Sequence, residues 1–170
     1  MAKILDTAYF SAPATQLAPD LVGKLICRRH DDGTILRCRI TETECYYGES
    51  DTACHASRGR TPRTDTLYMA GGVAYVYLCY GIHDLFNIVT GPEGHPEAVL
   101  LRGVEGACGP GRATRRLCIT RGFNRRPLSP ETGLWLEDDG TAPLFQALPR
   151  VGIGYASEED QARLWRFLSK

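Results

Sequence analysis

Residues 73–90 of the chain read VAYVYLCYGIHDLFNIVT. The two halves of this stretch, residues 73–80 and 85–90, are rich in the β-branched and aromatic side chains that favour strands. Gly81 opens the short segment between them and permits a sharp reversal of the chain. The stretch therefore predicts a β-hairpin that carries the aromatic ring of Tyr80 at its tip.

The segments on either side of this hairpin predict more antiparallel pairs. Residues 24–30 and 34–46 flank the turn sequence DDG, a strong hairpin signal. Two glycines at 71–72 suggest a further hairpin, with residues 67–69 as its first strand. The remaining expected elements are strands at 98–104, 134–136 and 151–153 and short helices at 11–23 and 111–119.

Hairpins outnumber helices in this reading, and no repeat divides the chain. We therefore expect an α+β fold that forms a single domain over residues 1–170. Its expected architecture is a curved, mostly antiparallel β-sheet with a protruding β-hairpin and a few flanking helices.

The composition excludes several classes of protein. The chain has 170 residues, of which 43% are hydrophobic and 24% charged, as in ordinary globular domains and unlike disordered or collagen-like chains. No apolar run reaches the ~18 residues that a membrane span needs, and the first residues do not resemble an export signal. Seven cysteines occur without any CxxC pair, so we expect free thiols in a reducing cytoplasm and no metal.

The charges are balanced in number but divided along the chain. The chain has twenty basic and twenty acidic side chains, and 17 of the basic residues are arginine. Residues 109–126 hold six arginines and residues 57–64 hold three, with no acidic residue in either segment. Arginine presents a planar fork that grips phosphate, although a high-GC genome also favours its codons. These two segments are candidates for a surface that faces phosphate groups.

The strand expected at residues 38–46 carries the candidate catalytic group. Alternation along a strand places Glu42, Glu44 and Tyr46 on one face together with Ile40. His55 follows in an irregular loop, so a carboxylate, an aromatic ring and an imidazole lie close in sequence. A glutamate in such a setting can act as a general base.

Three kinds of function fit these residues. The first is an enzyme that acts on nucleic acid with Glu44 as its base, and the second is a nucleic-acid-binding module without catalysis, for which Glu44 would have no use. The third is a glycosidase for a small nucleoside or sugar, since Glu42 and Glu44 are spaced within the range of inverting glycosidases. A protruding Tyr80 and the arginine segments would then have no role.

Five motifs resemble one family, the alkyladenine (3-methyladenine) DNA glycosylases of the type that lacks a helix-hairpin-helix. The stretch ITETECYYGESDTACHASRGRTPR is similar to the family's ETEAY and AAH elements, and YVYLCYGIHDLFNI is similar to its YVYxxYGxxxxxNI. AVLLRGVE, GPGRATRRLCIT and RVGIGYA resemble three further motifs in the family's order. Cys45 departs from the pattern, because the family usually has alanine there. The resemblance covers nearly the whole chain.

The resemblance implies a monofunctional glycosylase of base excision repair. Such an enzyme flips an alkylated or deaminated purine out of duplex DNA and hydrolyses its N-glycosidic bond, which leaves an abasic site. Glu44 resembles the base that activates water, and Arg102 resembles the residue that holds this water beside the Val151 backbone. Tyr46, His55 and Tyr77 resemble the walls of the base pocket.

The same resemblance assigns the remaining site residues. Asn87 resembles the residue that opposes the exocyclic amino group of normal guanine, and Tyr80 resembles the wedge that intercalates in the DNA. Further expected DNA contacts are Gly81, Ile82, Arg58, Arg63, Arg115 and Arg116. The implied protein is a cytoplasmic, nucleoid-associated bacterial monomer that needs no cofactor or metal, acts on double-stranded DNA with damaged purines and has no membrane partner.

Overall fold

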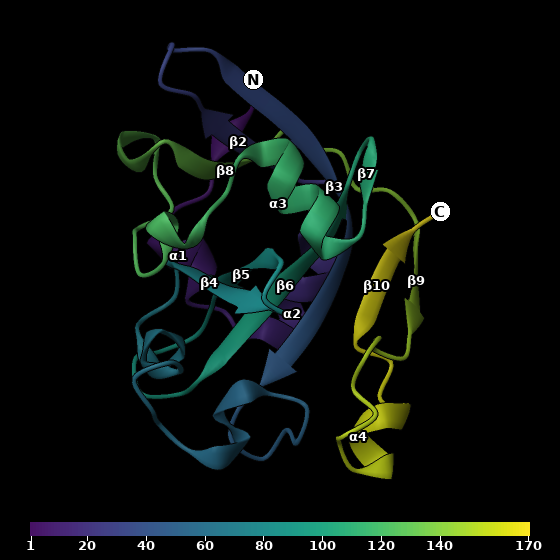
Figure 1. The fold of residues 1–170 in the computed structure, drawn as a ribbon. Coiled ribbons are helices and arrows are strands. Elements are labelled where there is room, and N and C mark those ends of the chain that lie inside the picture. The colour runs from purple at the N-terminus through teal and green to yellow at the C-terminus, as the bar shows by residue number, and fades with distance from the viewer.

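A computed structural model describes all residues, 1–170. Its centre is the long strand β3 (Ile35–Tyr47), and every strand pair is antiparallel (Figure 1). The main sheet has the order β1-β8-β2-β3-β6-β5-β4, while β10 pairs with the second half of β3 and with β9. The other strands are β1 (Lys3–Ile4), β2 (Leu25–Arg29), β4 (Ala74–Cys79), β5 (His83–Val89), β6 (Glu97–Val104), β7 (Ala107–Cys108), β8 (Leu134–Asp138), β9 (Phe145–Leu148) and β10 (Arg166–Ser169).

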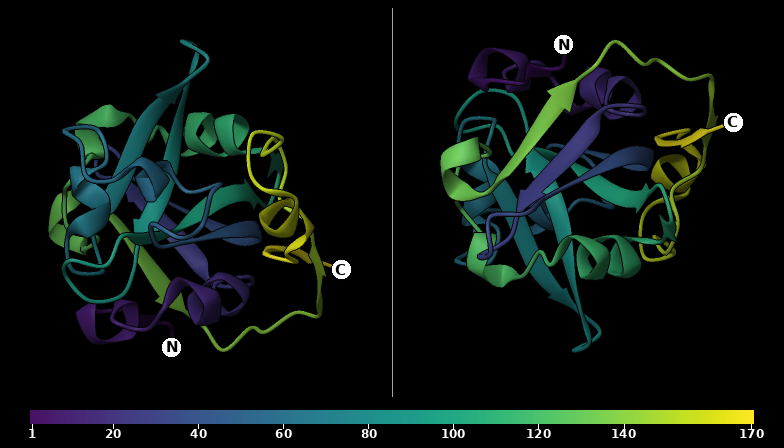
Figure 2. Two further views of the ribbon diagram at one scale, coloured as in Figure 1. Left: turned by 90° about the horizontal axis from the view of Figure 1, so that it is seen from below. Right: turned by 90° about the horizontal axis from the view of Figure 1, so that it is seen from above.

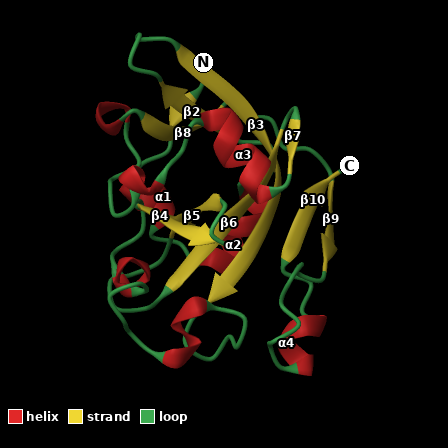
Figure 3. Cartoon of the chain, in the orientation of Figure 1, coloured by secondary structure: helices red, strands yellow, loops and turns green.

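Four short α-helices flank the sheet (Figure 3). α2 packs against β3 and β6, and α3 packs against β5 and β6; both contribute to one core cluster of 27 buried residues. The fold is thus an α+β domain with a mostly antiparallel sheet, as the sequence predicts. The helices are α1 (Thr7–Phe10), α2 (Ala14–Asp20), α3 (Pro110–Leu117) and α4 (Glu158–Ala162), and 3-10 turns occur at His55–Arg58, Asp65–Tyr68, Arg121–Phe123 and Pro130–Thr132.

The β4–β5 hairpin protrudes from the body of the molecule (Figure 2). At its tip the Ile82 N–H donates to the Cys79 carbonyl, and both central residues of the turn, Tyr80 and Gly81, have positive φ. Type I′ turns require this conformation, which suits the twist of the flanking strands. The tip therefore holds Tyr80 outward, with 89% of its surface exposed.

A β-bulge in β3 corrects the expected face of one residue. The register against β6 shifts on both sides of Glu42, with one extra residue in β3 between Ile40 and Glu42 and one in β6 between Gly103 and Leu101. Ile40 consequently lies in the core with Cys45, not on the face of Glu42 and Glu44. The prediction that Ile40 shares the carboxylate face is wrong, because strict alternation does not survive a bulge.

Two expected strands are not formed. Residues 67–69 belong to the 3-10 turn Asp65–Tyr68 and its cap, and the Gly71 position lies against the Phe10 carbonyl instead of in a hairpin. Residues 151–153 form an irregular turn, since the Val151 N–H bonds to a side chain and not to a neighbouring strand. Six strands and α-helices of two to five residues escaped prediction: β1, β7, β9, β10, α1 and α4. None of the helices is long and apolar enough to cross a membrane.

Candidate functional site

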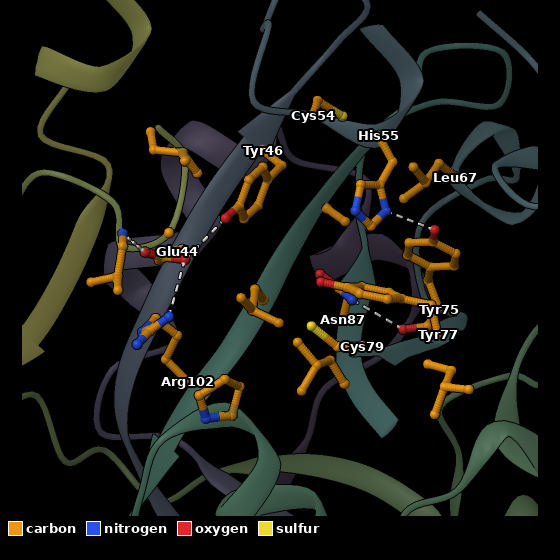
Figure 4. A pocket seen from close by; sticks show the side chains of 18 of the residues that line it. Glu44, Tyr46, Cys54, His55, Leu67, Tyr75, Tyr77, Cys79, Asn87 and Arg102 are labelled. Atoms are coloured by element: carbon orange, nitrogen blue, oxygen red, sulfur yellow. Dashed lines mark hydrogen bonds and ion pairs between the residues drawn. The ribbon is translucent and has the colours of Figure 1, made fainter. Parts of the chain in front are cut away.

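A cavity of about 530 Å³ opens on the face of β3, β6, β5 and β4 that is turned away from the core. Alternation along the strands supplies both sides: Thr43 and Cys45 are buried on the core side, while Glu44 and Tyr46 line the cavity. Figure 4 shows Glu44, Tyr46 and Arg102 on one side of this cavity and His55, Tyr75, Tyr77 and Asn87 on the other.

Glu44 is fully buried, and three groups contact its carboxylate. Oε2 accepts a hydrogen bond of 2.7 Å from the Val151 N–H, and Oε1 accepts one of 3.0 Å from the Tyr46 hydroxyl. Arg102 Nη1 lies 3.6 Å from Oε1. The carboxylate thus has a fixed orientation at one end of the cavity.

The pKa of Glu44 is raised above its ordinary value because burial disfavours the charged form. The Arg102 cation and the hydrogen bonds from Val151 and Tyr46 oppose this effect. A carboxylate with a raised pKa is a stronger base than an exposed one, which suits proton abstraction from water near neutral pH.

Glu42 shares the face of Glu44 but has a different environment. Its Oε1 accepts hydrogen bonds from Arg102 Nε at 3.3 Å and from Arg166 Nη1 at 3.1 Å. Two arginines therefore neutralise this carboxylate, and it orients the guanidinium of Arg102 toward Glu44. Glu42 is absent from the residues that line the cavity.

An aromatic wall faces Glu44 across the cavity. The ring of His55 lies edge-on to Tyr77, with centroids 4.6 Å apart, and its Nδ1 is 3.0 Å from the Tyr75 hydroxyl. Burial lowers the pKa of His55 to about 4, with a smaller contribution from Arg63, so the imidazole is neutral at neutral pH. The wall is therefore uncharged, apart from the Arg63 guanidinium 5.5 Å from the Tyr77 ring centroid.

Asn87 on β5 lies at the base of this wall. Its Nδ2 donates a hydrogen bond of 3.2 Å to the Tyr75 carbonyl, which fixes the orientation of the amide. Val151 closes the cavity next to Glu44 and is 46% exposed. The structure thus brings together Glu44, Arg102, Tyr46, His55, Tyr77, Asn87 and Val151, and Tyr80 lies at the mouth of the same cavity.

Several lining residues were not predicted as site residues. Tyr75 and Cys79 follow from the same alternation as Tyr77 along β4, so the period of two would have found them. Tyr155 donates its hydroxyl proton to the Ala53 carbonyl over a separation of 102 residues, which no local pattern reveals. No group of three potential metal-ligating side chains gathers in the chain.

The arginine segments divide into paired and unpaired residues. Arg121 pairs with Asp84, and Arg125 pairs with Asp65, so folding supplies acidic partners that the local sequence lacks. The predicted DNA contacts Arg58, Arg63, Arg115 and Arg116 have no ion-pair partner, and neither has Arg112. Arg63 lines the cavity, and Arg115 borders the groove between α3 and the hairpin, beside Gly81 and Ile82.

The sequence is similar to known proteins along nearly its whole length, including every segment that lines the cavity. Residues 8–108 and 105–170 match the family of methylpurine-DNA glycosylases. A protein from Psychrobacter cryohalolentis, named as a 3-methyladenine DNA glycosylase, is 42% identical over 93% of this chain and 88% of its own length. Proteins of the same name from Methanocella arvoryzae and Sodalis glossinidius are each 37% identical over 98% of this chain and cover 92% and 96% of their own lengths.

These matches span both β3 with Glu44 and the turn with Val151, the two segments that meet at the carboxylate. They confirm the resemblance that the sequence motifs indicate. The chain belongs to the methylpurine-DNA glycosylases, a family of DNA repair enzymes that hydrolyse N-glycosyl bonds in DNA.

Proposed function

We propose that the protein is a monofunctional glycosylase that removes alkylated or deaminated purines from double-stranded DNA. It flips the damaged nucleotide into the cavity, hydrolyses the N-glycosidic bond with a water molecule activated by Glu44, and leaves an abasic site for base excision repair. The observation that carries this proposal is a fully buried glutamate opposite a wall of aromatic rings in a cavity of about 530 Å³.

The energetics of extrusion are compatible with this cavity. A base inside a duplex is inaccessible, and flipping it out costs a few kcal/mol. Stacking on an aromatic side chain contributes about 1–3 kcal/mol per base. Tyr46 on one side and Tyr77 with His55 on the other supply such surfaces, so they can offset the cost.

The proposed chemistry needs one base and one water. Glu44 takes a proton from the water as its oxygen attacks C1′ of the sugar, and the C1′–N bond breaks with its electron pair going to the purine. A purine alkylated on a ring nitrogen is cationic and leaves as a neutral molecule, so it needs no acid. Electron-rich rings such as Tyr46 and Tyr77 also favour a cationic base.

The remaining residues receive supporting roles in this proposal. Arg102 and the Val151 backbone hold the water near Glu44, and Asn87 excludes guanine by opposing its exocyclic amino group. Tyr80 fills the place that the flipped base leaves, while Gly81, Ile82 and the unpaired arginines contact the DNA backbone. No lysine lines the cavity, so no side-chain amine there can form a Schiff base with the sugar. We therefore expect no cleavage of the DNA backbone. All these groups come from one chain, and we propose that the protein acts on nucleoid DNA in the bacterial cytoplasm as a monomer.

The direct test uses a panel of duplex oligonucleotides, each with one lesion: 3-methyladenine, 7-methylguanine, hypoxanthine or ethenoadenine. We expect alkali-labile abasic sites at the lesion and no strand break before alkali treatment. An undamaged duplex of the same sequence is the control. Strand breaks without alkali would contradict the monofunctional assignment, and the absence of abasic sites with all four lesions would overturn the function.

The salt dependence of binding tests the arginine surface. Affinity for undamaged duplex should fall steeply with salt, with a slope of about −0.9 for each phosphate contact in log–log form. Replacing Arg115 and Arg116 by alanine should flatten this slope by about 2, because both are unpaired. Arg37→Ala is the matched control, since Arg37 pairs with Glu137 away from the cavity. Fluorescence anisotropy between 50 and 300 mM salt measures the slopes, and a wild-type slope near zero would contradict DNA binding through this surface.

A further inference from the structure

A buried ion pair lies directly behind the cavity. The side chains of Arg150 and Asp51 are 0% and 1% exposed, and two hydrogen bonds of 2.7 and 2.9 Å join the guanidinium to the carboxylate. Arg150 Nη1 also donates a bond of 2.9 Å to the Cys45 carbonyl, and the guanidinium lies 4.9 Å from the centre of the Tyr46 ring. Neither charge contacts the cavity itself.

A contribution to stability alone does not explain why Arg150 and Asp51 are buried as an ion pair. Removing two charges from water is expensive, and an apolar pair of similar volume often stabilises a fold as well or better. A buried pair of this kind instead fixes a geometry. Arg150 and Asp51 are 99 residues apart in sequence, so their contact joins two distant segments. Hydrogen bonds from the Thr52 N–H to Asp160 and from the Tyr155 hydroxyl to the Ala53 carbonyl also join these segments, but neither involves a neighbour of Glu44 or Val151.

The geometry that it fixes is that of the Glu44 carboxylate. Arg150 bonds to Cys45, the residue after Glu44, and it immediately precedes Val151, whose N–H donates to Glu44 Oε2 at 2.7 Å. Residues 150–153 belong to no strand, so no ladder of backbone hydrogen bonds holds this N–H in place. Arg166 adds one contact, from its Nε to the Pro149 carbonyl at 2.8 Å.

We infer that Arg150, with Asp51, is a positioning residue of the reaction: it holds the Val151 N–H against Glu44 Oε2, so that the carboxylate keeps its ionised form and turns Oε1 toward the cavity. This inference rests on the proposed role of Glu44 as the base. The other groups that face Glu44 are Arg102 from β6, Tyr46 from β3 and Tyr155 from the 150–155 segment, with Glu42 and Arg166 next to them.

The test compares variants of Arg150 by single-turnover release of 7-methylguanine from DNA. This lesion carries a cationic ring in the nucleotide, so it leaves without help from an acid. The fall in rate at acidic pH, the acidic limb of the pH–rate profile, therefore reports the protonation of Glu44. The double variant D51N/R150M removes both charges and leaves no unpaired one. Its rate at neutral pH should fall about tenfold, and its acidic limb should move up by about one pH unit, the size expected for one lost bond to a charged group. The Kd for lesion DNA should stay within about twofold.

Two further variants separate positioning from folding. R150K keeps the charge but loses the bidentate fork, so it should shift the limb in the same direction by a smaller amount, and it carries the test if the double variant does not fold. R37M/E137Q removes a different ion pair, that of Arg37 with Glu137 away from the cavity, and should lower the melting temperature without moving the acidic limb. An unmoved limb in every folded Arg150 variant, with Glu44→Gln inactive, would overturn positioning alone, whereas an active Glu44→Gln would overturn the proposed function.

Discussion

Glu44→Gln is expected to abolish base release while the protein still binds lesion DNA. Glutamine has the shape of glutamate but cannot take a proton from water, and general bases typically contribute about 10²–10⁴ in rate. Its amide oxygen can accept the Val151 N–H, and its NH₂ can donate to the Tyr46 hydroxyl, so the cavity keeps its walls. Single-turnover base release and anisotropy binding on the same lesion duplex measure the two effects separately.

Glu42→Gln is the matched control, because Glu42 lies on the same face two residues away. Its carboxylate bonds to Arg102 and Arg166 and does not line the cavity. The variant should lose less than about tenfold in rate, through a less well-oriented Arg102. Equal losses in the two variants would revive a mechanism with two carboxylates and contradict the assignment of Glu44 as the single base.

Glu44→Gln should also raise the stability of the fold. The pKa of Glu44 is raised in the folded state, so folding favours the protonated form and the ionised carboxylate costs free energy at neutral pH. The stability that Glu44 contributes is present below its unfolded pKa and is lost as the pH rises through the folded pKa. The glutamine variant cannot ionise, so its free energy of unfolding should exceed that of the wild type at pH 7 and approach it below about pH 4. Denaturant titrations at several pH values measure this, and a less stable variant at pH 7 would contradict it.

The sequence predicted the parts of the site that depend on local periodicity. Alternation along β3 placed Glu44 with Tyr46, because residues two apart share a face. The bulge next to Glu42 defeated the same rule for Ile40, since a bulge depends on the partner strand and leaves no clear mark in composition. Alternation therefore predicts which face of the sheet a side chain occupies only where the strand pairing has no bulge.

The parts that the sequence did not predict depend on contacts between distant segments. Arg150 meets Asp51 across 99 residues, and no spacing in the sequence reveals this contact. Val151 meets Glu44 across 107 residues, and only the family resemblance, not a local pattern, placed the Val151 backbone beside Glu44. The arginines show the converse: Arg121 and Arg125 looked unpaired in their own segment, but folding brings Asp84 and Asp65 to them. A count of local charge thus overestimates the surface available to phosphate.

Tyr80→Asn should weaken base release from duplex DNA without weakening the fold. Tyr80 is 89% exposed and has a φ of +51°, a conformation that asparagine tolerates better than other non-glycine residues. The folded protein therefore loses no packing, and its melting temperature should stay the same or rise. In the proposed DNA complex the variant lacks the ring that would stack in the gap left by the flipped base, worth about 1–3 kcal/mol, or about 5- to 150-fold in the flipped population.

The structure of the DNA decides how much of that loss is seen. In a paired duplex the wedge must compensate for broken pairing, in a mismatch the lesion is already partly free, and in a single strand no gap needs filling. Single-turnover release by Tyr80→Asn should therefore fall most in the paired duplex, less in the mismatch and little in the single strand. Ile82→Asn is the control at the same tip, where an exposed side chain that only touches the DNA should affect both duplexes equally. An equal loss for Tyr80→Asn on all three substrates would place Tyr80 in the cavity wall, because only a contact with the base itself is indifferent to what surrounds the base.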